Sequence, residues 1–455
     1  MQYIHAKQAL TAQGWQNDIQ IDIAPDGRIT RLGAQDSPPS QQLDLALPAP
    51  VDLHSHSFQR AMAGLTESRG PDRGDSFWSW RTLMYRFLER LTPDHVEAIA
   101  ALVFMEMLEA GYGAVGEFHY LHHGPDAKPY AHLPEMAARI VAAAQTAGIG
   151  LTLLPVLYQT GGCDGQPLAG GQRRFGNDID RFARLFEGSR KVIAAGHRDD
   201  LIGVAPHSLR AVDQAGLEAA AALCPHGPIH MHLAEQIAEV AQVEAHLKAR
   251  PVEWLLDTQD VDRRWCLIHC TQTTPSETRA LARSGAVAGL CPITEANLGD
   301  GIFNATGFLA AGGIFGFGSD SNVEISLFNE ARMLEYSQRL RDNSRAALAA
   351  PNHSTGRVLL EHAAKGGAQA AGRAAGAIGI GLQADVIGLA TDNQWLCNRT
   401  GDAALDSLIF GGHGQDCITD VWSAGRHVVK EGRHSRRDAI ICKFRAAIAE
   451  LGQEI

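Results

Sequence analysis

The stretch Val51-Asp52-Leu53-His54-Ser55-His56-Ser57 closes an apolar run and opens a long loop-like segment. In a β-strand, residues i and i+2 project from the same face, so His54 and His56 can present two imidazoles to one metal ion. A His-x-His pair alone is a weak signal, because two histidines at a strand end can also be ordinary polar residues. A metal site would need further ligands, and these are expected at the ends of later strands.

Strand-like apolar segments recur along the middle of the chain. We expect eight: one ending at residues 54–56, then residues 114–120, 150–158, 202–207, 228–232, 265–269, 286–291 and 314–320. Helical segments rich in Ala and Leu separate most of them. One helix is expected to begin at Thr92-Pro93-Asp94, which supplies an N-cap residue, a proline at the first position and an early acid, and to stop at Gly111 and Gly113. This alternation predicts an α/β fold, a (β/α)8 TIM barrel with its site at the C-terminal strand ends. A doubly wound open sheet is the alternative fold, but no G-x-G-x-x-G turn follows the first strand.

The two chain ends have a different pattern. Residues 1–48 alternate polar and apolar side chains, as in residues 19–23, and contain turn signals such as Pro25-Asp26-Gly27. This pattern predicts short antiparallel strands with one solvent-exposed face. Residues 384–389 and 419–426 look similar. We therefore expect residues 1–48 and 376–455 to form one small β domain, and residues 49–375 to form the barrel.

Composition limits the possible partners. The net charge is -11, and the chain has no basic block, which argues against nucleic acid and acidic membrane surfaces and favours a small molecule. No apolar run reaches the ~20 residues that a membrane helix needs. Eight scattered cysteines without a C-x-x-C pair, and an N-terminus unlike a signal peptide, predict a cytoplasmic protein. Cys266 and Cys270 could be ligands, but buried free thiols are the favoured interpretation.

Polar side chains gather at the predicted C-terminal strand ends. The fifth strand ends in His230-Met231-His232 followed by Glu235, the sixth in His269 and the eighth in Asp320. Each of them could be an ordinary satisfied polar residue. Because a barrel brings all these ends together, their recurrence favours a metal site.

These residues resemble the ligand pattern of the amidohydrolase superfamily. The resemblance implies a barrel with a β-sandwich built from both chain ends. Metal ligands are then expected at His54, His56, His232 and Asp320. The fourth strand carries Val204-Ala205-Pro206-His207-Ser208 and no lysine, which implies a single zinc ion instead of a lysine-bridged pair.

Within that superfamily, nearly the whole chain resembles the formimidoylglutamate deiminases. The stretches that carry this resemblance are residues 53–64, 75–81, 205–210, 230–236, 291–301 and 318–321. Ile293 stands where the family pattern has a threonine. The resemblance implies zinc-dependent release of ammonia from N-formimidoyl-L-glutamate in histidine degradation, by a homodimer.

Three imidazoles and a carboxylate leave one position of a zinc-like ion open for water, whose pKa falls toward ~7. Ammonia leaves only after its nitrogen is protonated, so a proton shuttle is needed. The family pattern favours Glu235 for this role, although a carboxylate at a helix N-terminus is an equal interpretation from the sequence alone. Asp320 would also accept a proton from the water, and His269 would hydrogen-bond the hydroxide or the developing charge. His269 as a further ligand remains the alternative.

A substrate with two carboxylates requires arginine forks and other donors. The expected substrate-binding residues are Gln59, Arg81, Tyr120, His207 and Arg210. Arg81 lies among tryptophans and could instead be a surface cation packed on aromatic rings. Residues 161–176, rich in Gly, are a candidate for a loop that closes over the substrate.

Two other functions stay open at this point. A deaminase of the same superfamily acting on a nucleobase-like ring would favour aromatic stacking over paired arginines. A barrel that has lost its chemistry and acts as a scaffold would be expected to lack ligands or Glu235, and this sequence retains both.

Overall fold

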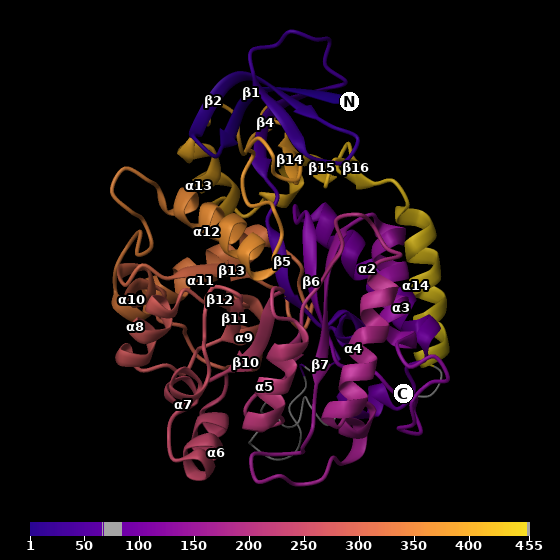
Figure 1. The fold of residues 1–455 in the computed structure, drawn as a ribbon. Coiled ribbons are helices and arrows are strands. Elements are labelled where there is room, and N and C mark those ends of the chain that lie inside the picture. Colours follow the sequence, from indigo (N-terminus) through magenta and orange to yellow (C-terminus); the bar gives the residue numbers. More distant parts are fainter. Residues whose placement is uncertain (66, 68–83, 453–455) are drawn as a thin grey trace.

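The computed structural model describes residues 1–65, 67 and 84–452. Two parts are visible in Figure 1: a sheet built from both ends of the chain, and below it a ring of parallel strands surrounded by helices. Among the described residues, no helix has the length and apolar character needed to cross a membrane.

The terminal sheet has eight strands in the order β17-β16-β15-β14-β4-β1-β2-β3. The N-terminal strands are β1 (Gln2–Thr11), β2 (Gly14–Ile23), β3 (Ile29–Gly33) and β4 (Gln41–Pro48). The C-terminal strands are β14 (Val386–Leu389), β15 (Ile418–Ser423), β16 (Arg426–Lys430) and β17 (Arg433–His434). Antiparallel pairing of β4 with β14 joins the two chain ends. A separate apolar core that includes Ile4, Ile21 and Trp422 packs this unit, so the expected β domain built from both ends is confirmed.

Two details of the predicted terminal strands are wrong. Strand β4 runs parallel to β1, whereas the alternation predicted antiparallel neighbours only. Gln20 and Asp22 were expected on a solvent-exposed face, yet both are buried. The Gln20 side chain donates to Asp22 Oδ1 at 2.6 Å and accepts from the backbone of Asp36 and Ser37, so the loop after β3 covers these polar groups and satisfies them.

The eight predicted barrel strands are all present. They are β5 (Val51–Ser55), β6 (Ala114–His119), β7 (Gly150–Leu157), the pair β8 (Leu201–Ile202) and β9 (Ala205–Pro206), β10 (Ile229–Leu233), β11 (Trp265–His269), β12 (Val287–Leu290) and β13 (Ile314–Phe317). They form two parallel arcs, β5 to β8 and β10 to β13. Parallel bridges at Val204–Ile229 and Ser55–Asp320 close the arcs into a barrel.

The fourth strand is interrupted, although the sequence predicted it as continuous over residues 202–207. Residues on either side of the interruption pair with β7. Between them, the N–H of Val204 donates to Pro228 O, and its carbonyl accepts from His230 N, on the opposite neighbour. The interruption is therefore a change of pairing partner, and it completes the barrel.

Helices surround the strands (Figure 1). They are α2 (Pro93–Glu109), α3 (Glu135–Ala147), α4 (Ile179–Ile193), α5 (Gln214–Leu223), α6 (Ile237–Leu247), α7 (Pro251–Thr258), α8 (Pro275–Ser284), α9 (Pro292–Leu298), α10 (Ala305–Ala310), α11 (Leu327–Asp342), α12 (Thr355–Ala370), α13 (Asp402–Phe410) and α14 (Arg437–Gly452). Short 3-10 turns are η1 (Ser57–Met62), η2 (Gly170–Arg174) and η3 (Gln415–Cys417).

Helix α2 begins as the sequence predicted. The Thr92 side chain accepts from His95 N, and Pro93 occupies the first helical position. The helix ends at Glu109, shortly before Gly111, whose φ of 95° needs the freedom of glycine. Helix α14, from the C-terminal region, runs beside α2 on the barrel instead of on the terminal sheet (Figure 1).

Candidate metal centre and active site

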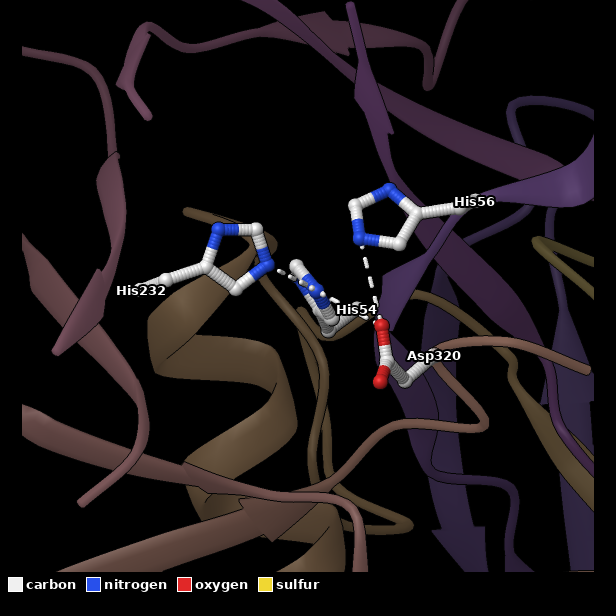
Figure 2. Close-up of side chains that lie close together, drawn as sticks. All are labelled: His54, His56, His232 and Asp320. Atoms are coloured by element: carbon white, nitrogen blue, oxygen red, sulfur yellow. Dashed lines mark hydrogen bonds and ion pairs between the residues drawn. The ribbon is translucent and has the colours of Figure 1, made fainter. Parts of the chain in front are cut away.

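Four side chains converge at the C-terminal end of the barrel (Figure 2). They are His54 on β5, His56 just after it, His232 on β10 and Asp320 just after β13. His54 Nε2 lies 3.1 Å from His232 Nε2 and 3.2 Å from Asp320 Oδ1, and His56 Nε2 lies 3.2 Å from the same oxygen. A tetrahedron with metal–ligand bonds of about 2.0–2.1 Å has edges of about 3.3 Å, so these separations fit a zinc-sized ion.

Backbone carbonyls orient two of the three imidazoles. His56 Nδ1 donates to Phe118 O at 3.1 Å, and His232 Nδ1 donates to His207 O at 3.1 Å. A carbonyl only accepts, so each Nδ1 carries the hydrogen and each Nε2 keeps its lone pair for a metal. This arrangement is typical of metal-ligating histidines.

The protonation states in the cluster suit a cation. Burial lowers the pKa of His54 to about 3, and burial together with the neighbouring histidines holds the pKa of His232 well below its ordinary value. Burial raises the pKa of Asp320, but its contacts with His54 and His56 outweigh burial and hold that pKa well below its usual range. Neutral imidazoles and an ionised carboxylate are the forms that bind metal.

The strand ends that carry these residues have unusual backbone angles. Ala234, His269, Cys270 and Asp320 all have positive φ, between 48° and 70°. Non-glycine residues rarely adopt this region, and such strain is concentrated at functional sites. The chain therefore turns sharply just after β10, β11 and β13, where the predicted site residues lie.

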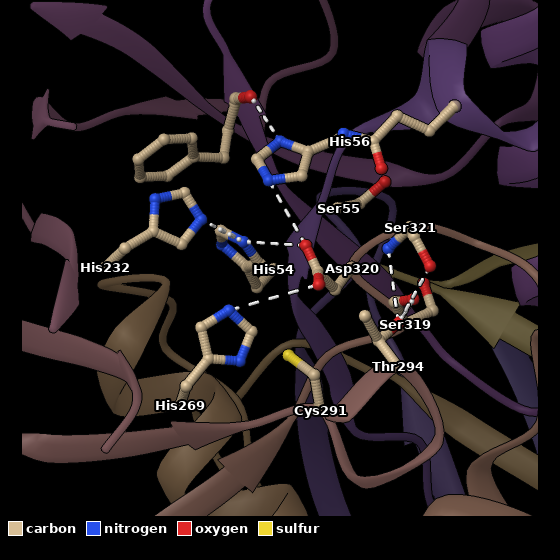
Figure 3. A network of polar contacts seen from close by, with 12 residues as sticks. His54, Ser55, His56, His232, His269, Cys291, Thr294, Ser319, Asp320 and Ser321 are labelled. Carbon is tan, nitrogen blue, oxygen red and sulfur yellow. Dashed lines mark hydrogen bonds and ion pairs between the residues drawn. The ribbon is translucent and has the colours of Figure 1, made fainter. Parts of the chain in front are cut away.

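The loop after β13 is held by a polar network (Figure 3). Asp320 N donates to His54 O, and His56 N donates to Asp320 O, both at 2.9 Å. The Thr294 hydroxyl lies 2.9 Å from Ser321 Oγ and donates to Ser319 O. The position of the Asp320 carboxylate is thus fixed by backbone and side chains together.

Glu235 lies between two cationic partners beside the cluster. Its Oε2 is 3.5 Å from Arg210 Nη2, and its Oε1 is 3.8 Å from His269 Nε2. Helix α6 begins two residues later, so Glu235 is near a helix start, but its side chain is buried in the site. Burial raises the pKa of Glu235 above its ordinary value, although His269 and Arg210 act in the opposite direction. A buried acid with a raised pKa suits proton transfer near neutral pH.

His269 lies beside the four-residue group and outside it. Its Nε2 is 4.0 Å from Asp320 Oδ2 (Figure 3). Its Nδ1 is 3.3 Å from Glu295 Oε1. Burial disfavours the imidazolium, but Glu235, Glu295 and Asp320 outweigh burial and raise the pKa of His269 to about 10. A histidine surrounded by carboxylates is a hydrogen-bond donor on both ring nitrogens.

One pocket contains most of the predicted site. The predicted residues that line it are His56, Gln59, Tyr120, His207, Arg210, His232, Glu235, His269 and Asp320. Gln59 Nε2 donates to Tyr120 Oη at 2.7 Å, while Gln59 Oε1 is buried without a hydrogen-bond partner among the described residues. His207 Nδ1 lies 3.0 Å from Ser208 Oγ. Arg81 lies outside the described residues, so its predicted position stays a prediction.

The pocket wall also contains six residues that were not predicted from the sequence: Met84, Tyr85, Tyr158, Phe175, Leu298 and Ser321. Tyr158 follows β7 at a C-terminal strand end, so a search of every strand end for aromatic as well as polar residues would have found it. Phe175 is the second-last residue of the glycine-rich segment 161–176 and packs against Tyr120, with ring centroids 4.6 Å apart. Met84 and Tyr85 gave no signal in the sequence.

The structure agrees with the interpretation of Cys266 and Cys270 as buried thiols that do not bind the metal. Cys266 and Cys270 are buried free thiols and lie outside the four-residue ligand group. A different thiol, Cys291, lies with His269 and Glu295 in a second compact group.

The barrel, the terminal sheet and the convergent ligands together define a class, the metal-dependent hydrolases. A sequence profile described as "Amidohydrolase family" matches residues 45–428, and one described as "Formimidoylglutamate deiminase HutF, N-terminal domain" matches residues 1–40. A formimidoylglutamate deiminase from Pseudomonas aeruginosa is 46% identical over 456 aligned residues, which cover 99% of this chain and 100% of that protein. The chain belongs to the formimidoylglutamate deiminase family of amidohydrolases.

Solved structures share this fold. A crystal structure of an amidohydrolase from Brucella melitensis is 49% identical, with a TM-score of 0.95 and coverage of 99% of this chain and 100% of that one. An adenosine deaminase from Xanthomonas campestris with bound zinc is 20% identical, with a TM-score of 0.82 and coverage of 99% and 98%. The second likeness shows the shared fold alone.

Proposed function

We propose that this enzyme hydrolyses N-formimidoyl-L-glutamate to N-formyl-L-glutamate and ammonia, as a step of histidine degradation. The observation that carries the proposal is that a buried acid and a guanidinium line one pocket together with three residues of the four-residue metal-ligand set. Family membership supports the same reaction. The alternative of a scaffold protein without catalytic activity would require the loss of metal ligands or of Glu235, and all of these residues are present.

We propose one zinc ion, held by His54, His56, His232 and Asp320. The donor types, their separations and the Nδ1 hydrogen bonds of His56 and His232 fit this ion. When bound, zinc would lower the pKa of a water in its open position toward ~7, so that hydroxide is available at neutral pH. The proposal of a single ion rests on the absence of a lysine after β8.

The substrate would lie with a carboxylate on Arg210 and its formimidoyl group near Glu235. Arg210 Nη2 is already 3.5 Å from Glu235, so a bound carboxylate would share the guanidinium with that acid. His207, Gln59 and Tyr120 offer further polar groups on the same wall. Arg210 would supply the planar fork that a carboxylate favours.

The reaction needs two proton movements. Addition of water to the carbon of the protonated, amidinium-like formimidoyl group gives a tetrahedral carbon that bears a hydroxyl and an amino group, and releases one proton of the water. Glu235 would take a proton as the water adds and deliver it to the amino nitrogen, after which the C–N bond breaks and ammonia leaves. Asp320 would accept the remaining hydroxyl proton as the C=O bond forms. His269, with Nε2 directed at both acids, would donate a hydrogen bond to the oxygen that develops charge.

The test is ammonia release by the zinc-loaded protein from N-formimidoyl-L-glutamate, with N-formimidoyl-L-aspartate and guanine as comparison substrates. Glu235→Gln is expected to lower kcat by ~10²–10⁴-fold, the usual contribution of a positioned acid–base group. Glu277→Gln is the matched control, because Glu277 is also buried and pairs with an arginine, Arg250, outside the pocket. Equal losses in the two variants would contradict the role of Glu235.

A nucleobase-like substrate is the alternative, and one observation favours it. Tyr85, Tyr120, Tyr158 and Phe175 line the pocket and could stack on an aromatic ring. Ammonia release from guanine, without release from the formimidoyl compounds, would establish this alternative.

We also propose that the enzyme is a cytoplasmic homodimer. All eight cysteines are free thiols, which supports a reducing compartment. Light scattering on the purified protein would test the dimer.

A further inference from the structure

Glu295 is a buried carboxyl group that the proposed reaction leaves without a role. It lies in α9, near the C-terminal end of β12, and only 4% of it is exposed. Its Oε1 accepts the backbone N–H of Cys291 at 2.9 Å, and its own N–H donates to Cys291 O at 2.9 Å. The first turn of α9 therefore holds this carboxyl group in one position.

The same oxygen faces the catalytic histidine. His269 Nδ1 lies 3.3 Å from Glu295 Oε1, while Nε2 on the opposite side of the ring faces Glu235 Oε1 at 3.8 Å and Asp320 Oδ2 at 4.0 Å. His269 thus lies between a fixed acceptor behind it and the reacting groups in front of it. A histidine ring can flip, and a fixed partner on one nitrogen decides which nitrogen faces the other way.

We propose that Glu295 is a positioning residue that sets the ring orientation of His269 and keeps a hydrogen on its Nδ1. The geometry behind this inference is that Oε1 accepts one N–H from the backbone and a second from the ring. His269 has a strained backbone conformation, with a φ of 70° at the turn that follows the strand. A side-chain partner such as Glu295 would help to hold the residue in this conformation. The inference concerns how His269 is held, and its catalytic consequence rests on the proposed function.

Glu295 and His269 would therefore have different roles: one orients the ring, and the other contacts the reacting groups. Glu295 fixes the back of the ring, and His269 presents Nε2 to the space between Glu235 and Asp320. Without Glu295, the ring would lose the contact that distinguishes its two nitrogens. The chemistry would slow, while substrate contacts at Arg210 would remain.

The experiment compares Glu295→Leu, which removes the acceptor, with Glu295→Gln, whose amide oxygen can still accept both N–H groups. Glu295→Leu is expected to lower kcat by ~10–100-fold, as for other partners that orient site histidines, with KM within about threefold. Glu295→Gln is expected to recover most of this loss. If Glu295→Leu does not fold, Glu295→Met, with a flexible apolar side chain, carries the same test.

Glu330→Leu is the matched control. Glu330 is also buried and accepts a backbone N–H of α9, from Ile293 at 2.9 Å, but it does not line the pocket. Both leucine variants should lower the thermal unfolding temperature, and only the variant at position 295 should lower kcat. Equal effects on kcat, or an unchanged kcat in Glu295→Leu, would overturn the proposal.

A measurement independent of activity separates this inference from the proposed reaction. With ¹⁵N-labelled histidine, the signals of His269, assigned by their loss in His269→Gln, should report a hydrogen on Nδ1 in the wild type and in Glu295→Gln. In Glu295→Leu the hydrogen on Nδ1 loses its acceptor, so the Nδ1–H signal should weaken through exchange with water. Unchanged signals would refute the positioning role even if the enzyme acts on another substrate.

Discussion

Arg373 joins the barrel to the terminal β domain through buried charges. Its Nε lies 2.7 Å from Asp385 Oδ2, just before β14, and its Nη2 lies 2.9 Å from Asp199 Oδ2, just before β8. Arg426 on β16 contacts the other oxygen of Asp199 at 2.5 Å. The side chains of Arg373 and the two aspartates are at most 4% exposed, so water cannot replace a lost partner.

We predict that Arg373→Leu lowers the free energy of unfolding by ~3–5 kcal/mol, because it leaves two buried carboxylates with one remaining guanidinium. A pH dependence accompanies this effect. Burial raises the pKa of Asp199, but Arg426 and Arg373 outweigh burial and lower it from 3.8 to about 2. Ionised Asp199 therefore stabilises the wild type by ~2 kcal/mol above pH 4, and this stabilisation is lost as the pH falls from 4 to 2. The loss should be smaller in Arg373→Leu.

The assay is urea unfolding followed by circular dichroism at several pH values. Lys7→Met is the control, because Lys7 also pairs with an aspartate, Asp44, but its side chain is 72% exposed. An exposed pair of this kind contributes less than ~1 kcal/mol. If Arg373→Leu lost no more stability than Lys7→Met, the buried network would not connect the two parts of the molecule as argued.

Three further outcomes are expected at the site. Removal of metal by a chelator should abolish ammonia release, and added zinc should restore it; full activity of metal-free protein would exclude the proposed chemistry. Arg210→Met should raise KM for N-formimidoyl-L-glutamate by ~10–100-fold, since a charged hydrogen-bonding fork is lost, and a KM within twofold of wild type would place the carboxylates elsewhere. Gly318→Ala should weaken zinc binding ~10–100-fold in a competition titration, because the added Cβ would lie 2.7 Å from His54 Cβ and from His54 O and would displace this ligand. Unchanged affinity would show that β5 can move without disturbing the ligands.

The barrel and the strand ends were predictable because both leave local signals. Strands are short apolar runs, and a buried polar residue at the end of such a run, such as His232 or Asp320, is conspicuous in the sequence. The parallel order of a barrel then brings these ends together without any knowledge of tertiary contacts. This reasoning gathers the candidate polar residues at one site, whereas the choice of the four ligands and of Glu235 came from the family resemblance.

Other features left no local signal. The interruption of the fourth strand depends on Val204 changing its pairing partner, which is a property of two neighbouring strands. Gln20 and Asp22 are buried because a later loop covers them, and alternation in the sequence cannot show that loop. Glu295 lies within a stretch that carried the family resemblance, yet its contact with His269 appears only when β11 and β12 are side by side.

Barrel closure and the metal site depend on the same pairing of β5 with the end of β13. Asp320 N and O bond to His54 O and His56 N, and this bridge is one of the two that close the barrel. The Asp320 side chain contacts the imidazoles of the same two histidines. A shift of one residue in this register would direct the carboxylate to the other face of the strand and disperse the ligands. Asp320→Asn, which keeps the backbone bonds, should therefore fold and close the barrel while it loses zinc. An unfolded Asp320→Asn protein would show instead that the carboxylate itself is needed for closure.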